Sequence, residues 1–143
     1  MRDQNTPNPV LPDPTRPRRL HWLAYVVMSL AFVEGAWLAF DGVHALTTGD
    51  YVTPASGRFA GQLGPWSKVV AAVGIPPRST AMKLIHVALG AAWLVSIAMF
   101  GFRARSGWGA MLACAIAGLW YLPFGTLIGV ILIALLCLPR VRT

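Results

Sequence analysis

Residues 20–43 read LHWLAYVVMSLAFVEGAWLAFDGV, an apolar run that carries two carboxylates, Glu34 and Asp41. The run is long enough to cross a hydrocarbon core of about 30 Å. It is also longer than the apolar segment of about 7–15 residues in a signal peptide. The stretch therefore predicts a retained membrane-spanning helix with acidic side chains inside it.

The composition of the whole chain is that of a membrane protein. Its 143 residues are 56% hydrophobic and 12% charged, whereas soluble domains carry roughly 25% charged residues. The net charge of +7 is spread between and beside the apolar runs, and no basic helix with interleaved aromatic residues is present. The composition favours a single transmembrane domain over residues 20–143 and argues against a nucleic-acid partner.

Three further apolar runs predict three more spans. Read as one helix, residues 107–138 would be about 48 Å long and would overshoot the core. Two short spans joined by a turn at Pro123-Phe124-Gly125 fit better, and a re-entrant hairpin is the alternative. We therefore expect an all-α fold, an integral membrane four-helix bundle. The expected spans are about 20–43, 81–102, 107–122 and 124–138.

Two segments outside these spans are rich in proline. Residues 1–19 hold five prolines and no apolar periodicity, which predicts a disordered cytoplasmic tail. Residues 45–80 are punctuated by glycine and proline, and irregular backbone is not tolerated in contact with lipid. This second segment is expected to be a long structured extracytoplasmic loop between the first two helices.

Inside the loop, residues 65–73 predict a short helix in the membrane interface, and its expected apolar face consists of Trp66, Val69, Val70 and Val73. Ser79 or Thr80 is expected to cap the start of the second span, because a hydroxyl at this position accepts a hydrogen bond from a free backbone amide.

Basic side chains set the expected orientation, since cytoplasmic segments carry an excess of Lys and Arg. Eight basic residues fall on the side of the N-terminus and four on the side of the loop. We therefore expect a multi-pass protein of the bacterial plasma (inner) membrane with both termini cytoplasmic. The eight are Arg2, Arg16, Arg18, Arg19, Arg103, Arg105, Arg140 and Arg142, and the four are Arg58, Lys68, Arg78 and Lys83.

Five polar side chains are expected to form an intramembrane and interface cluster, four of them at the outer ends of the first two spans. Asp41 and His44 are three residues apart and share a helix face, as do Lys83 and His86. Glu34 lies deeper, near mid-bilayer, where a carboxylate is costly and by default indicates a functional site. We expect Glu34 to contact His86 or the backbone of the second span.

The sequence contains no G-x-S-x-G, H-E-x-x-H or Walker motif, so no catalytic residue is expected. The first interpretation of the polar cluster is that its role is purely structural. Asp41 then pairs with Lys83 or Arg78 and holds the loop. The expected function is then that of a non-catalytic accessory or structural subunit of a larger membrane complex, without a cofactor. Its expected partners are the lipid bilayer and other membrane subunits or further copies of the chain.

Two alternatives assign chemistry to the same cluster. In the first, His44 and His86 ligate a haem, or bind a metal together with Asp41. In the second, Glu34 and His86 carry protons, ions or a small solute as part of a transport component.

Glycines predict close helix packing in the last two spans. Gly107, Gly109 and Gly118 precede the turn, and Gly125 and Gly129 follow it. Small residues let helices approach closely, so we expect contact between these two spans, with a dimer face as the other interpretation.

The stretch DGVHALTTGDYVTPASGRFAGQLGPWSKVVAAVGIPPRSTAMKL (residues 41–84), together with LWYLPFGTLIGV (119–130), resembles small, uncharacterised four-span bacterial integral membrane proteins. In that family a Gly/Pro-rich outer loop follows the first span, and a Pro-x-Gly-Thr turn precedes the last. The resemblance covers most of residues 30–138. It implies architecture and location, and it implies no activity, cofactor or catalytic residue.

Overall fold

The computed structural model of the chain describes residues 22–141, and the predicted tail at 1–19 lies outside this range. Within it the fold is all-helical, as expected, with five helices and no strand. The helices are α1 (Trp22–Thr48), α2 (Trp66–Ala72), α3 (Thr80–Gly101), α4 (Gly107–Ala117) and α5 (Phe124–Leu136).

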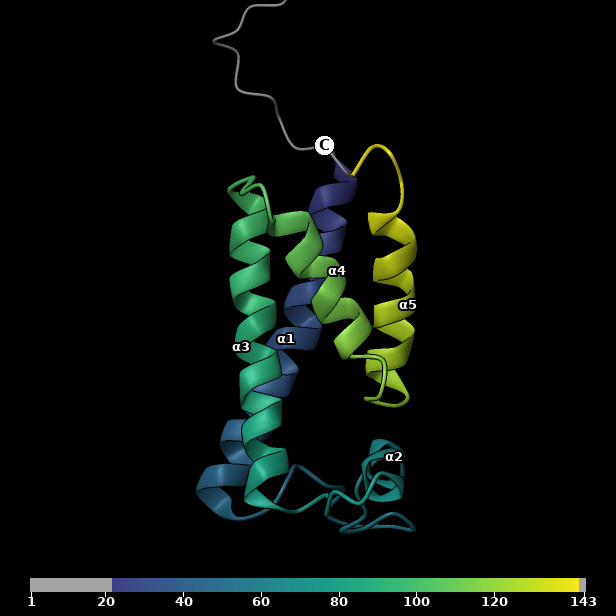
Figure 1. Cartoon of the computed structure of the whole chain (residues 1–143). Coiled ribbons are helices and arrows are strands. Elements are labelled where there is room, and N and C mark those ends of the chain that lie inside the picture. The colour runs from purple at the N-terminus through teal and green to yellow at the C-terminus, as the bar shows by residue number, and fades with distance from the viewer. Residues whose placement is uncertain (1–21, 142–143) are drawn as a thin grey trace, which may run out of the picture.

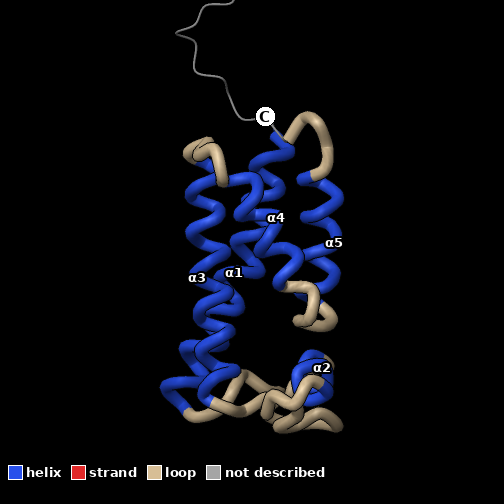
Figure 2. The backbone as a smooth tube through the Cα atoms, viewed as in Figure 1, coloured by secondary structure: helices blue, strands red, loops and turns tan. Residues whose placement is uncertain are grey.

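Four of the helices lie side by side, and the fifth lies across one end (Figure 1). Contacts join α1 to α3, α3 to α4, α4 to α5, and α5 back to α1. Their inner faces meet in one core, in which Leu38, Trp93, Met111 and Leu132 are fully buried. The short α2 and the surrounding loop lie below the tip of the α4–α5 hairpin (Figure 2).

Helices α1 and α3 are long and apolar enough to cross a membrane, at 27 and 22 residues. Only 33% and 28% of their most apolar windows are buried inside the protein, whereas the core helix of a soluble protein is mostly buried. Their remaining apolar side chains therefore point outward. Such an outward apolar surface is typical of a helix that contacts lipid.

The ends of these two helices are fixed by local hydrogen bonds. Helix α1 continues five residues beyond the predicted end at 43, and in its last turn the Thr48 hydroxyl donates to the His44 carbonyl at 2.8 Å. It stops where Gly49 adopts a φ of +97°, a conformation that favours glycine after a helix. At the start of α3, Ser79 is the cap, because its hydroxyl accepts from the Met82 amide at 3.2 Å.

Glycines bring α1 and α3 into close contact. A Cβ atom at Gly42 would lie 2.8 Å from the Val87 amide nitrogen, and one at Gly90 would overlap the backbone of Ala39. The sequence predicted such close packing between the last two spans and not between α1 and α3. There, Gly129 does pack against the Ala115 carbonyl, whereas nothing lies within 4 Å of a Cβ at Gly109.

Helices α4 and α5 are shorter than predicted. Eleven and thirteen residues correspond to about 17 and 20 Å, which is less than the core of about 30 Å. Residues 118–123 form the turn, earlier than the predicted Pro123–Gly125, and the Thr126 hydroxyl closes it by donating to the Leu119 carbonyl at 2.7 Å. The hairpin consequently does not extend as far along the bundle as α1 does, and the loop lies beyond its tip (Figure 1).

The short helix predicted over residues 65–73 is present as α2. Trp66 and Val70, four residues apart, form its buried face. Val73, which was expected on the same face, lies after the helix and is 71% exposed. Gly74 follows with a φ of +82° and turns the chain toward α3.

Candidate ligand cavity beside Glu34

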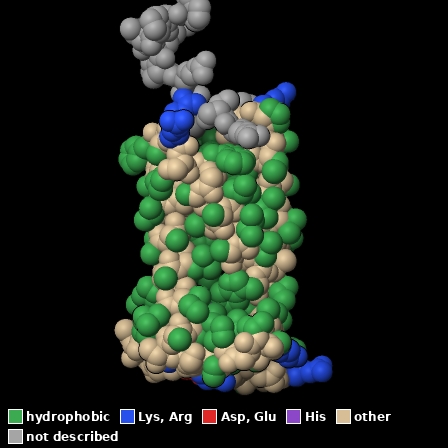
Figure 3. Space-filling view, viewed as in Figure 1, with side chains coloured by type: hydrophobic (Ala, Val, Ile, Leu, Met, Phe, Trp, Pro, Cys, Tyr) green, Lys and Arg blue, Asp and Glu red, His purple; other side chains and the backbone are tan. Residues whose placement is uncertain are grey.

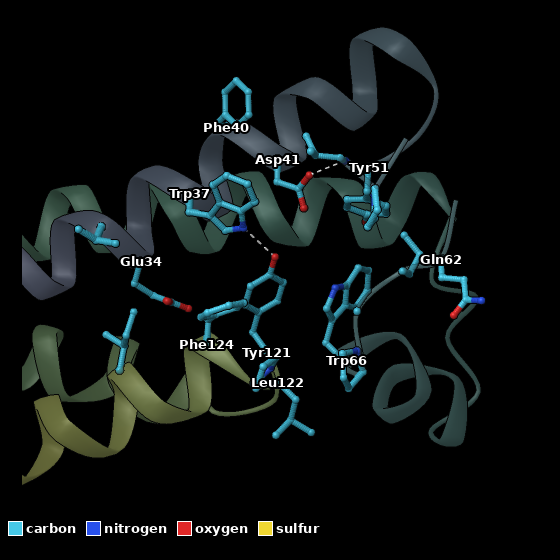
Figure 4. Close-up of a pocket in the computed structure, with 18 of the residues that line it drawn as sticks. Glu34, Trp37, Phe40, Asp41, Tyr51, Gln62, Trp66, Tyr121, Leu122 and Phe124 are labelled. Carbon is cyan, nitrogen blue, oxygen red and sulfur yellow. Dashed lines mark hydrogen bonds between the residues drawn. The ribbon is translucent and has the colours of Figure 1, made fainter. Parts of the chain in front are cut away.

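A cavity of about 840 Å³ lies where the loop meets the helices. One wall is the 33–41 face of α1, the second is the loop between Tyr51 and Trp66, and the third is the hairpin turn with the start of α5. Figure 4 shows the side chains of these three elements around the same space. The wall is mostly aromatic and aliphatic, and its acidic groups are Glu34 and Asp41.

Glu34 is 2% exposed and lines this cavity. Its Oε1 atom has no hydrogen-bond partner among the described residues. The carboxylate lies against α5, since a Cβ at Gly125 would be only 2.6 Å from Oε1. The first turn of a helix favours a nearby negative charge. Glu34 was expected to contact His86 or the backbone of α3. That expectation is wrong, because its carboxylate lies against α5 (Figure 4).

Asp41 anchors the loop through a backbone amide. It is 3% exposed, and its Oδ1 accepts a hydrogen bond from the Val52 N–H at 2.9 Å. The anchoring role was predicted, but the partner was not, since Lys83 and Arg78 were expected. Lys83 instead donates to the Gly49 carbonyl, which ties α3 to the first residue after α1.

Four aromatic side chains of the cavity lining, those of Trp37, Tyr51, Trp66 and Tyr121, contact one another and form an aromatic wall. The Trp37 indole N–H donates to the Tyr121 hydroxyl at 2.9 Å, which joins α1 to the hairpin turn. Trp66 stacks on Tyr121 with ring centroids 5.9 Å apart, and Tyr51 meets Trp66 edge-on at 5.1 Å. The wall therefore ties together α1, the loop, α2 and the turn.

His86 lies behind this wall and is completely buried. Its ring is within 6 Å of four aromatic rings, those of Tyr51, Trp66, Trp120 and Tyr121. Its Nδ1 lies 2.9 Å from the Met82 carbonyl, so Nδ1 carries the proton, while Nε2 has no partner among the described residues. His86 packs the aromatic wall and does not line the cavity.

The predicted cluster is thus divided between different surroundings. Glu34 and Asp41 line one cavity, His86 lies behind its wall, and Lys83 holds the end of α1. His44 is partly exposed and stacks on Phe40 at 6.0 Å.

Neither cofactor alternative fits this arrangement. Within residues 22–141, no group of three or more His, Cys, Asp or Glu side chains is placed to hold a metal ion. The aromatic rings packed around His86 also take up the space that a haem ligated by His44 and His86 would need.

An ion pair fixes the outer part of the loop. The Arg78 guanidinium contacts the Asp50 carboxylate at 2.9 Å and also donates to the Gly61 carbonyl at 3.0 Å. This hydrogen-bonded pairing lowers the pKa of the Asp50 carboxyl. Because both side chains are about half exposed, water screens the pair and its contribution to stability is small.

Sequence reasoning missed the aromatic residues of the site. Trp37 and Tyr51 were not singled out, and Tyr121 was interpreted only as one of the aromatic residues that gather near a membrane interface. One signal was available: Trp37 and Asp41 lie three and seven residues after Glu34 and therefore share its helix face.

No protein-family model, curated protein or solved structure matches the chain. The resemblance to small four-span bacterial membrane proteins therefore stays a prediction.

Proposed function

We propose that this chain is a non-catalytic integral membrane protein that holds a small lipophilic molecule in the cavity beside Glu34. The observation that carries the proposal is the buried Glu34 carboxylate, whose Oε1 atom has no hydrogen-bond partner among the described residues, in a mostly apolar cavity of about 840 Å³. Cavities of roughly 300–1,000 Å³ with apolar walls and a few polar groups are typical small-molecule sites. An unsatisfied buried polar atom is costly, and a ligand that hydrogen-bonds to Glu34 would remove that cost.

The mouth of the cavity favours entry from lipid. Trp37, Phe40, Phe59 and Phe124 line the cavity, and all four are also exposed on the outer surface. An exposed ring in contact with both the cavity and the surroundings suits a lateral opening toward hydrocarbon. A lipophilic molecule dissolved in the bilayer would then reach Glu34 without crossing water.

The distribution of charge supports a membrane location. Figure 3 shows Lys and Arg side chains at the two ends of the visible face, with hydrophobic side chains between them. We propose that α1 and α3 cross the membrane of a bacterial cell. The α4–α5 hairpin would enter from the end that carries Arg103 and Arg140, the cytoplasmic side in the expected orientation. Four complete spans are not needed, because the loop fills the depth that the short hairpin leaves.

An accessory role in a larger membrane complex agrees with this function, since a subunit that holds a ligand needs no catalytic group. The apolar outer faces of α1 and α3 would contact lipid or neighbouring subunits. Transport through Glu34 and His86 has less support, because aromatic rings separate His86 from the cavity.

Native mass spectrometry tests the function directly. The full chain would be extracted from its membrane in mild detergent, and we expect a retained small molecule in the spectrum. Ala36 lines the cavity, so Ala36→Trp should fill it and remove the bound species. Ala92→Trp is the matched control, because Ala92 is exposed on α3 and does not line the cavity.

Thermal unfolding in the same detergent shows whether both variants fold. If folded wild-type protein carries no bound molecule, or if Ala36→Trp retains the molecule as the wild type does, the proposed function is wrong.

A further inference from the structure

We propose that the cavity selects organic cations with an apolar body, and that the Glu34 carboxylate is the counter-charge for the cationic centre. The inference rests on the proposed function and specifies the chemistry of its ligand. It is carried by the charge of the lining, the kind of side chains around it and the position of Glu34.

The lining is acidic in a basic protein. Only five of the 143 residues are Asp or Glu, against twelve Lys and Arg. Two of these five, Glu34 and Asp41, line the cavity, whereas none of the described Lys, Arg or His residues does. Such a site attracts positive charge and repels anions, since opposite charges interact strongly where water is excluded.

The two carboxylates are not equivalent. Asp41 already accepts a hydrogen bond from the Val52 amide, and this bond holds the loop. Glu34 makes no such bond through Oε1, although it is buried. It is therefore the carboxylate whose charge a ligand would balance.

The aromatic lining suits an organic cation. Rings of Trp and Tyr attract a cation placed over their faces, and Trp37, Tyr51, Trp66 and Tyr121 all line the cavity. A bare metal ion is disfavoured, because within the described residues no set of three metal-ligating side chains comes together. The volume of about 840 Å³ leaves room for an apolar body of several rings or a branched chain.

A matched pair of probes separates charge from shape. Methyltriphenylphosphonium and triphenylphosphine oxide have nearly the same outline, but only the first is charged. Binding of each to the full chain in lipid nanodiscs would be measured by equilibrium dialysis. We expect the wild type to bind the cation at least about tenfold more tightly than the oxide, and Glu34→Gln to remove most of this difference.

Asp50→Asn is the matched control. It also removes one carboxylate at the same end of the molecule, but Asp50 does not line the cavity, so the preference for the cation should persist. Ala36→Trp should weaken binding of both probes. Thermal unfolding of each variant confirms that it is folded.

Equal binding of the two probes by the wild type, no binding of either, or an unchanged preference in Glu34→Gln would overturn the inference. If both probes bind equally and Ala36→Trp weakens both, the cavity holds lipophilic molecules without regard to charge, and the proposed function stands alone. If the wild type also retains no molecule in native mass spectrometry, both proposals fail.

Discussion

Gly90 allows α3 to pack directly on the backbone of α1. A Cβ at this position would overlap the backbone of Ala39, and the nearby Gly42 is in similar contact with Val87. Gly42 lies in α1 next to Asp41, which lines the cavity, and Gly90 lies in α3 opposite Ala39. Their contribution is steric, because close approach lets α1 and α3 make extensive contact between their faces.

Gly90→Ala should therefore destabilise the fold. Overpacking of a tight interface costs about 1–3 kcal/mol, which we expect as a lower midpoint of thermal unfolding in detergent. Gly109→Ala is the control, since nothing lies within 4 Å of a Cβ at Gly109 and alanine is the better helix former. Equal stability of Gly90→Ala and the wild type would show that α1 and α3 do not pack as described.

At the scale of the elements, the loop is held at two places. Asp41 and the aromatic wall fix its inner part, and the ion pair of Asp50 with Arg78 fixes its outer part. The two attachments differ in their exposure to water. Only the outer one is expected to respond to pH and salt, because the Asp50 carboxyl is accessible to solvent.

The pairing with Arg78 lowers the pKa of Asp50 in the folded state. The ion pair therefore stabilises the loop above the ordinary carboxyl pKa of about 4, and this stabilisation is lost as the pH falls through the lowered value. We expect at most about 1 kcal/mol, since the pair is half exposed. The protection of the loop amides against hydrogen exchange, measured relative to the intrinsic exchange rate at each pH, should decrease below about pH 4.

Asp50→Asn should abolish this change in the hydrogen exchange of the loop at acidic pH. Lys68→Gln removes another charge from the same loop and should leave the acidic step in place. A step of unchanged size in Asp50→Asn would mean that another group controls the loop.

At the scale of the whole molecule, much of the helical layout could be predicted from hydrophobicity. The two long helices, the short interfacial helix and the Ser79 cap follow from local patterns, because run length and capping chemistry are properties of neighbouring residues. The end of α1 and the length of the hairpin helices were misjudged, since hydrogen bonds from the Thr48 and Thr126 hydroxyls to backbone carbonyls leave little trace in an apolar run.

The candidate site was only partly predictable for a related reason. Glu34 and Asp41 were found because a carboxylate in an apolar run is unusual. The contact of Glu34 with Gly125 joins residues 91 positions apart, and the hydrogen bond between Trp37 and Tyr121 spans 84. Such pairings depend on how the hairpin and the loop meet, and helical periodicity carries no information about that.

We propose that Glu34 faces a cavity that is open to lipid. Labelling with dicyclohexylcarbodiimide, a lipid-soluble reagent for carboxyl groups, tests it most directly, with the modified residue located by mass spectrometry of the full chain in membranes. We predict modification of Glu34 that Ala36→Trp suppresses and Ala92→Trp does not, while a water-soluble carbodiimide reacts at Asp50 instead. Glu34 that stays unmodified in the wild type, or that reacts equally in Ala36→Trp, would contradict the account.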